Sequence, residues 1–217
     1  MRQSVAFAAV ALVASFLVSA CILTPIPLVP RLPDPATPTP VPGTRTQALP
    51  PVPAGWPSAT LQLGMADDPG SAAAMKATAP FGFRYQYLAG GVNTGYGWAT
   101  WNAGGQFVTY YIQDSIANGI VPGFTYYMMY QSTPGNSMSE SAGDLANIQN
   151  TATMTAYYND LKLFFQRAGA FPANKVVLHV EPDLWGYLQQ AATNDDASTV
   201  PAKVAATGLP ELAGLPN

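Results

Sequence analysis

The sequence has few of the residues on which several classes of protein depend. Of its 217 residues only 10% are charged, and it has a single cysteine and a single histidine. Nine Lys and Arg residues, in a chain of formal net charge −3, give no clustered basic surface for phosphates, so we expect no nucleic-acid partner. One cysteine excludes a disulfide within the chain. With so few nitrogen and sulfur ligands we expect no zinc or other metal site, and no cofactor.

Two common catalytic motifs are also missing. No Gly-x-Gly-x-x-Gly segment or phosphate loop follows any expected strand, which disfavours a nucleotide-binding sheet. Ser132 and Ser137 lack a Gly-x-Ser-x-Gly context, which disfavours a serine hydrolase. The chemistry must therefore be sought among carboxylates and aromatic residues.

The residues before Cys21 form an export signal. An uncharged apolar run over residues 5–18 follows Arg2, and it is short for a membrane-spanning helix, which needs ~20 apolar residues. The segment Leu17-Val18-Ser19-Ala20-Cys21 resembles the bacterial lipobox. This resemblance implies that residues 1–20 are removed and that Cys21 is acylated. We expect an exported protein whose lipid anchors it to the outer face of the bacterial cytoplasmic membrane or to the cell surface.

A proline-rich segment follows the cysteine. Residues 22–58 contain twelve of the 21 prolines of the chain. Proline fixes φ and donates no backbone hydrogen bond, so this stretch is expected to be an extended spacer and not a helix or a central strand. Residues 21–58 are therefore predicted to be a lipidated Pro/Thr-rich linker that holds the globular part, residues 59–217, away from the membrane.

Strand-like and helix-like patterns alternate through the globular part. Strands are expected at residues 60–66, 83–88, 121–130 and 175–180, and helices at 107–118, 154–168 and 184–192. Residues 131–149 read as a polar loop. His179 lies inside the fourth strand, and we expect it in the core.

This alternation predicts an α/β fold with parallel strands and right-handed crossovers. A doubly wound sheet and a (β/α)-barrel (TIM-like) both satisfy it. Polar or flexible residues close each strand, as they do at the carboxyl ends of barrel strands, and the absence of a dinucleotide motif favours the barrel. Residues 59–217 are fewer than the ~250 of a full barrel. We therefore expect a partial barrel of about four βα units, truncated from a longer parent.

The strongest chemical pattern stands at the end of the fourth strand. Glu181 and Asp183 follow an apolar strand and precede Trp185. Burial raises a carboxyl pKa and yields a general acid that is protonated near neutral pH. Glycoside hydrolysis requires such an acid together with a second carboxylate. The alternative is that both carboxylates only cap the helix that follows.

Glu181-Pro182-Asp183, between an apolar strand and a leucine, resembles the signature of family 6 glycoside hydrolases, the inverting cellobiohydrolases and β-1,4-endoglucanases. The resemblance implies a β-glucan or cellulose-type substrate and Asp183 as the catalytic acid. Where that family has Tyr-Asp-Leu-Pro-Asp after the preceding strand, this chain has Tyr127-Met128-Met129-Tyr130-Gln131 and lacks the partner aspartate. Glu181-Pro182 also resembles the acid/base Glu-Pro of retaining barrel glycosidases, which implies Glu181 as the acid.

Residues near the expected strand ends are candidates for sugar binding. They are three tryptophans, a tyrosine and an aspartate: Trp98, Trp101, Trp185, Tyr127 and Asp67. Aromatic faces stack on sugar rings, and the aspartate can bind a hydroxyl, although rings also pack as lids and aspartates also form turns. The predicted function is a surface-anchored glycoside hydrolase, active in its full-length parent and inactive as a fragment. The alternatives are a non-catalytic glycan-binding lipoprotein and a degenerate barrel that serves as an adhesin.

Overall fold

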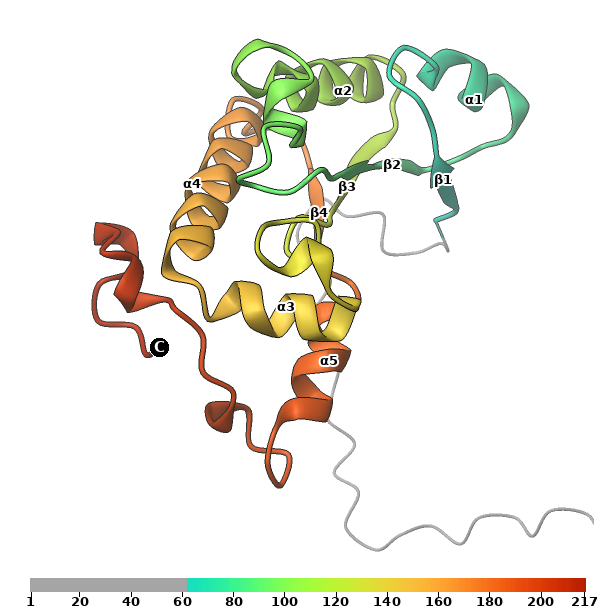
Figure 1. The fold of residues 1–217 in the computed structure, drawn as a ribbon. Coiled ribbons are helices and arrows are strands. Elements are labelled where there is room, and N and C mark those ends of the chain that lie inside the picture. Colours follow the sequence, from blue (N-terminus) through green and yellow to red (C-terminus); the bar gives the residue numbers. More distant parts are fainter. Residues whose placement is uncertain (1–61) are drawn as a thin grey trace, which may run out of the picture. The chain divides into compact units, whose positions relative to one another are not determined.

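The computed structural model describes residues 62–217, so the export signal, Cys21 and the linker lie outside the described residues. The strands are β1 (Gly64–Ala66), β2 (Phe83–Leu88), β3 (Val121–Tyr126) and β4 (Val177–Val180). The helices are α1 (Ala72–Thr78), α2 (Gln106–Ala117), α3 (Glu140–Ile148), α4 (Thr151–Ala168) and α5 (Leu184–Ala191), and short 3-10 turns lie between them and after α5 (Figure 1).

The four strands form one parallel sheet in the order β1-β2-β3-β4. This confirms the predicted α/β class with parallel strands. In the register, Tyr87 of β2 pairs with Thr125 of β3, which pairs with His179 of β4. Because side chains alternate along a strand, these three residues lie in one row on one face of the sheet.

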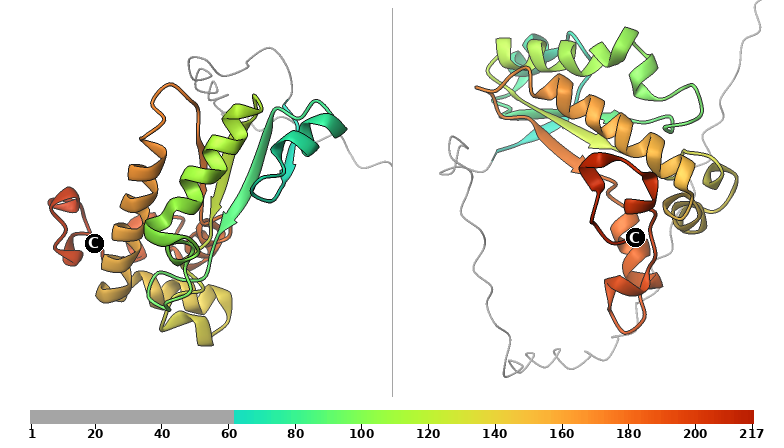
Figure 2. Two further views of the ribbon diagram at one scale, coloured as in Figure 1. Left: turned by 90° about the horizontal axis from the view of Figure 1, so that it is seen from above. Right: turned by 90° about the vertical axis from the view of Figure 1, so that its left-hand side faces the viewer.

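Helices α2 and α4 lie side by side against the other face (Figure 2). Phe124 of β3 lies between Tyr111 of α2 and Phe164 of α4. Its ring centroid is 5.3 Å from that of Tyr111 and 5.4 Å from that of Phe164. Further buried side chains complete this core: Leu88, Trp98, Val108, Ile112, Tyr126, Met128, Met129, Ile148, Met154, Tyr157 and Leu184. Burial of apolar area, at roughly 25 cal/mol per Å², is the main force that holds the helices on this face.

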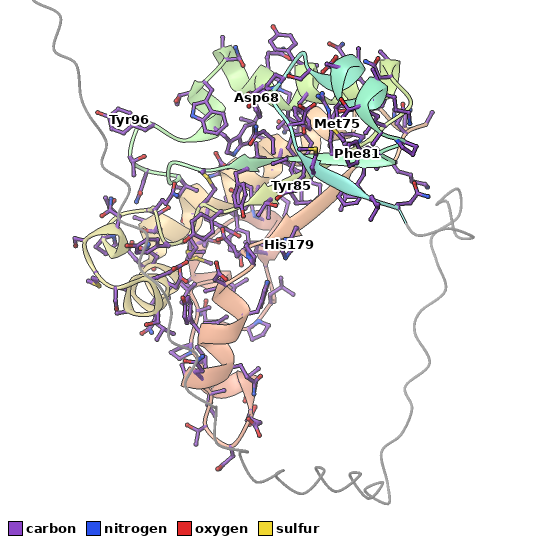
Figure 3. The ribbon with its side chains drawn as sticks, turned by 90° about the vertical axis from the view of Figure 1, so that its right-hand side faces the viewer. Asp68, Met75, Phe81, Tyr85, Tyr96 and His179 are labelled. Atoms are coloured by element: carbon purple, nitrogen blue, oxygen red, sulfur yellow. The ribbon has the colours of Figure 1, made fainter. Side chains whose placement is uncertain are left out.

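The opposite face of the sheet is a shallow groove that no helix of residues 62–217 covers. The residues that line it come from three strands and include Phe83, Tyr85, Tyr87, Gly123, Thr125, Val177 and His179. Figure 3 shows Tyr85 and His179 on this side. The prediction that His179 lies in the core is wrong, because its side chain is exposed here.

The third strand is shorter than predicted. β3 ends at Tyr126, four residues before the predicted end. Beyond it, the backbone N–H groups of Met128 and Met129 donate to the carboxylate of Glu181, at 3.0 and 3.1 Å, and not to a neighbouring strand. The carboxylate of Glu181 thus accepts the hydrogen bonds that a neighbouring strand would otherwise accept, and β3 ends before these residues.

Two helices have no counterpart in the sequence prediction. Helix α1 begins with six good helix formers, four alanines with a methionine and a lysine, and ends at Thr78. Helix α3 lies inside the predicted polar loop 131–149. Its Gly143 packs against Gly135, where a Cβ at position 143 would lie 2.5 Å from the Gly135 oxygen. Gly143, which resembles a helix breaker in the sequence, is therefore the residue at which α3 packs closely against the loop that contains Gly135.

Candidate active site at the carboxyl ends of β3 and β4

Glu181 follows the last residue of β4 and is buried, with 1% of its surface exposed. Its backbone has a positive φ of 45°, a rare conformation for a residue with a side chain. Its N–H donates to the oxygen of Tyr126 at 2.8 Å, and its carboxylate accepts from Met128 and Met129. Such strain persists only where surrounding bonds fix the residue, and here they fix it at the junction of β3 and β4.

The Glu181 carboxyl is a structural anchor that holds its proton tightly. Burial raises its pKa to about 8, against the lowering effect of the Met128 and Met129 N–H groups and of a hydrogen bond with Tyr157. The carboxyl therefore joins the end of β4 to the start of the β3–α3 loop and to α4.

Asp183, two residues further on, has the opposite surroundings. It occupies the N-cap position of α5, yet its carboxylate accepts no capping hydrogen bond from the helix. Its side chain is exposed. Asp183 therefore makes no capping hydrogen bond to α5, while its side chain lies at the N-terminal, positive end of the helix dipole.

Helix α3 brings two further carboxyls to the same place. Glu140 lies in its first turn, and its carboxylate accepts a hydrogen bond from the hydroxyl of Tyr127. Asp144 lies one turn later and is 2% exposed, and its Oδ1 is shielded from solvent and has no hydrogen-bond partner among residues 62–217. Burial first, and then the charges of Glu140 and Asp183, raise the Asp144 pKa to about 7.

Tyr127, a predicted sugar-binding residue, lies at this cluster and is half-buried. Burial and the hydrogen bond to Glu140 raise the pKa of its hydroxyl, which therefore stays protonated and acts as a donor. The carboxyl ends of β3 and β4 thus bring together Asp183, Asp144 and Glu140 with one phenol. We call these four residues the carboxyl cluster.

The three predicted tryptophans occupy different surroundings. Trp98 is 0% exposed, and its Nε1 donates to Asp160 Oδ2 at 2.6 Å, so its ring belongs to the core. Trp101 and Trp185 are exposed. The Trp101 ring meets Phe107 edge-on at 5.0 Å, and the Trp185 Nε1 donates to the oxygen of Val180 at 2.8 Å. Of the three, only Trp101 and Trp185 offer a ring face to a ligand.

Asp67, predicted to bind a sugar hydroxyl, belongs to an ion cluster around Arg84. The guanidinium of Arg84 is 0% exposed and lies 2.8 Å from Asp67 Oδ2 and 2.6 Å from Asp114 Oδ2. It also donates to Ser115 Oγ at 2.9 Å and lies 4.1 Å from the ring centroid of Tyr111. We call these five residues the arginine cluster. Its contacts give Asp67 a structural role between β1, β2 and α2.

Sequence reasoning missed Asp144 and Glu140 because it placed them in a loop. The signal was present in the helix start Ser139-Glu140 and in the spacing of Leu145 and Ile148. Within residues 62–217 no three His, Cys, Asp or Glu side chains are arranged to hold a metal ion. In the same range no helix is both long enough and apolar enough to cross a bilayer.

Comparisons with protein-family models, with curated proteins and with solved structures find no significant match to this chain.

Proposed function

We propose that this chain carries a glycoside hydrolase site in which Asp183 is the general acid and a β-glucan is the substrate. The observation that supports this most is the carboxyl cluster, which places an exposed carboxylate beside two others at the carboxyl end of parallel strands. Cleavage of a glycosidic bond uses an acid that protonates the leaving oxygen and a second carboxyl near it. The substrate class comes from the resemblance around Glu181-Pro182-Asp183.

The proposal includes a fold: the four strands are consecutive βα units of a (β/α)-barrel. In a doubly wound sheet the strand order reverses at a switch point, whereas here it follows the chain without reversal. Right-handed crossovers in such an order place all connecting helices on one face, where α2 and α4 lie. In a barrel the other face is the interior, and the site lies at the carboxyl ends of the strands.

Of the two candidate acids, Asp183 fits the role better than Glu181. A general acid must come within hydrogen-bond reach of the leaving oxygen. Glu181 is buried and accepts two backbone N–H groups, whereas Asp183 is exposed and accepts no bond from α5. The retaining-type assignment to Glu181 is therefore not part of the proposal.

The test is the hydrolysis of a soluble β-1,4-glucan, carboxymethyl cellulose, by the full-length protein. Release of reducing ends should fall by about 10²–10⁴ in Asp183→Asn, the usual contribution of general acid catalysis. Asp195→Asn is the matched control, because Asp195 is an exposed aspartate at a positive φ that asparagine tolerates. Equal hydrolysis by the wild type and Asp183→Asn would exclude the assignment.

A second candidate function is glycan binding without catalysis. It is favoured by the exposed rings of Trp101 and Trp185, which lie after the carboxyl ends of β2 and β4. In this case Trp101→Ala and Trp185→Ala should weaken retention on insoluble cellulose, while Asp183→Asn should bind like the wild type. Retention without any release of reducing ends would select this function over hydrolysis.

We also propose that the protein is exported and held at the membrane by a lipid on Cys21, which lies outside the described residues. The support is the sequence pattern of residues 1–21. A Cys21→Ala variant should lose acylation by radiolabelled palmitate and leave the membrane fraction. Wild-type behaviour of this variant would contradict the anchor.

A further inference from the structure

The face of the sheet opposite α2 and α4 is uncovered among residues 62–217, and its groove has no charged lining. We call this surface the open face. Its side chains are aromatic, aliphatic or neutral polar groups, and Figure 3 shows two of them: Phe83, Tyr85, Tyr87, Thr125, Val177 and His179. Because no Asp, Glu, Lys or Arg lines this groove, the open face of a second copy can meet it without repulsion between like charges.

The two edges of the sheet are also unprotected. The sheet ends at β1 on one side and at β4 on the other, so the outer backbone groups of both strands have no strand partner within residues 62–217. Proteins commonly protect a free edge with charged residues or proline. Neither β1, with the sequence Gly-Met-Ala, nor β4, with the sequence Val-Leu-His-Val, contains such a residue. Both edges are therefore suited to pairing with a further strand.

A second copy of the chain supplies a matching strand for both edges at once. All four strands are parallel and follow chain order, so β1 of a second copy placed beside β4 continues the sheet in the same direction. A two-fold axis along the barrel then brings β4 of the second copy beside β1 of the first. The result has eight parallel strands, as a closed (β/α)-barrel does, and no free edge remains.

We propose that two copies of this chain close one (β/α)-barrel, in which β4 of each copy pairs with β1 of the other and the two open faces fill the interior. The inference rests on the barrel fold that is part of the proposed function, and not on the reaction. Tyr87, Thr125 and His179, which lie in one row, form part of a layer of inward side chains in the closed barrel.

The second copy also completes the surroundings of the carboxyl cluster. Asp183 follows β4, which is an edge strand, so in a single copy the sheet extends from this point only toward β3. Parallel pairing places the carboxyl end of the partner's β1, with the turn that follows it, beside the end of β4. A ligand at the carboxyl cluster is then enclosed by two chains.

The first measurement is the mass of the full chain by sedimentation equilibrium at micromolar concentration, in a density-matched detergent that also keeps a lipid on Cys21 in solution. The expected mass is that of two chains. The mass of a single chain, which is the result if further strands of a longer parent cover the open face, overturns the inference. A mass above that of two chains also overturns it, because strand pairing that does not close leaves edges to which further copies add.

The second measurement places a charge in the interface. His179→Asp brings a carboxylate into the interior of the closed barrel, and Met65→Lys puts a lysine on the β1 edge that has to pair. Each should raise the Kd of the dimer roughly 10²-fold or more. Both side chains are exposed in a single copy, so the variants should keep the far-UV circular dichroism of the wild type. A dimer that persists in both variants lies at another surface and overturns the inference.

Tyr110→Asp is the matched control. Tyr110 lies on α2, on the helix side of the sheet, and is 52% exposed, so a new charge there should leave the mass of two chains unchanged. Neither measurement uses a substrate. Hydrolysis by a protein with the mass of one chain would leave the proposed function standing without this inference, and a dimer that hydrolyses nothing would do the reverse.

Discussion

The arginine cluster and the carboxyl cluster each contain a buried ionisable side chain, Arg84 and Asp144, but they differ in charge balance. In the first, one buried guanidinium meets the carboxylates of Asp67 and Asp114 at 2.8 and 2.6 Å. In the second, three carboxyls meet with no Lys, Arg or His among the groups that shift Asp144. Arg84 also contacts the hydroxyl of Ser115 and the ring face of Tyr111, whereas Oδ1 of Asp144 has no hydrogen-bond partner in the described part of the chain.

This difference separates a structural site from a candidate chemical one. In the arginine cluster each carboxylate lies against the guanidinium, and these contacts hold β1, β2 and α2 together. Within residues 62–217 no Lys, Arg or His forms an ion pair with the carboxyl cluster, and the pKa of Asp144 is raised to about 7. A group that gains or loses its proton near neutral pH can take part in acid–base catalysis, and a fixed ion pair cannot.

The largest expected effect is the loss of Arg84. Arg84→Met leaves Asp67 and Asp114 without their counter-charge and should lower the free energy of unfolding by about 4 kcal/mol, the usual cost of breaking a buried ion pair on one side. Urea unfolding measures this change. Lys76→Met, at an exposed lysine, should leave stability close to that of the wild type. A loss of unfolding free energy in Arg84→Met no larger than that in Lys76→Met would show that the arginine cluster is not structural.

The next effect concerns the Glu181 anchor. Glu181→Ala leaves the N–H groups of Met128 and Met129 buried without an acceptor, and it should cost about 3 kcal/mol at the usual penalty for unsatisfied donors. Glu181→Gln keeps an oxygen acceptor in place and should retain most of the stability. Chemical denaturation of both variants checks this. An equal loss in both would mean that hydrogen bonds to an oxygen at this position are not what stabilises the anchor.

A smaller, pH-dependent effect is expected at Asp144. Its pKa rises from 3.8 in the unfolded chain to about 7 in the folded one, so the folded state binds the proton more tightly. Its contribution to stability is then complete below pH 4 and is lost as the pH rises through 7. Asp144→Asn should therefore match the wild type at pH 4 and be more stable at pH 8, by about 2 kcal/mol for half of that shift at 1.4 kcal/mol per unit. Thermal unfolding of both proteins across this pH range measures the difference. A stability difference between wild type and Asp144→Asn that does not change with pH would contradict the prediction.

The alternating pattern of the sequence predicted the α/β class and the helices α2, α4 and α5, because these elements have clear periodicity. It missed α1 and α3; in α3 the glycine and polar residues outweighed the weaker helix signals of Ser139-Glu140 and of the spacing between Leu145 and Ile148. The Gly135–Gly143 contact that explains Gly143 joins the helix to a loop and is visible only in three dimensions.

The candidate site was predictable in part. Residue type and position identified the pair Glu181 and Asp183, but not which of them is buried. That depends on where the N–H groups of Met128 and Met129 point after β3 ends. His179 shows the same limit, since the sequence indicates its strand but not that this face of the strand is uncovered among residues 62–217.

The smallest expected effect belongs to an ion pair that resembles the arginine cluster in chemistry but not in burial. Lys162 of α4 bonds to Glu211 near the end of the chain, and both side chains are half exposed. Water screens such a pair and the side chains lose entropy in forming it, so Lys162→Gln should leave the unfolding midpoint unchanged within error. High salt screens this ion pair, and that screening should likewise leave the unfolding midpoint of the wild type unchanged. A clear fall of the unfolding midpoint in Lys162→Gln, reproduced in the wild type by high salt, would mean that this ion pair holds the last turns of the chain against α4. Burial alone would then not decide which ion pairs stabilise the fold.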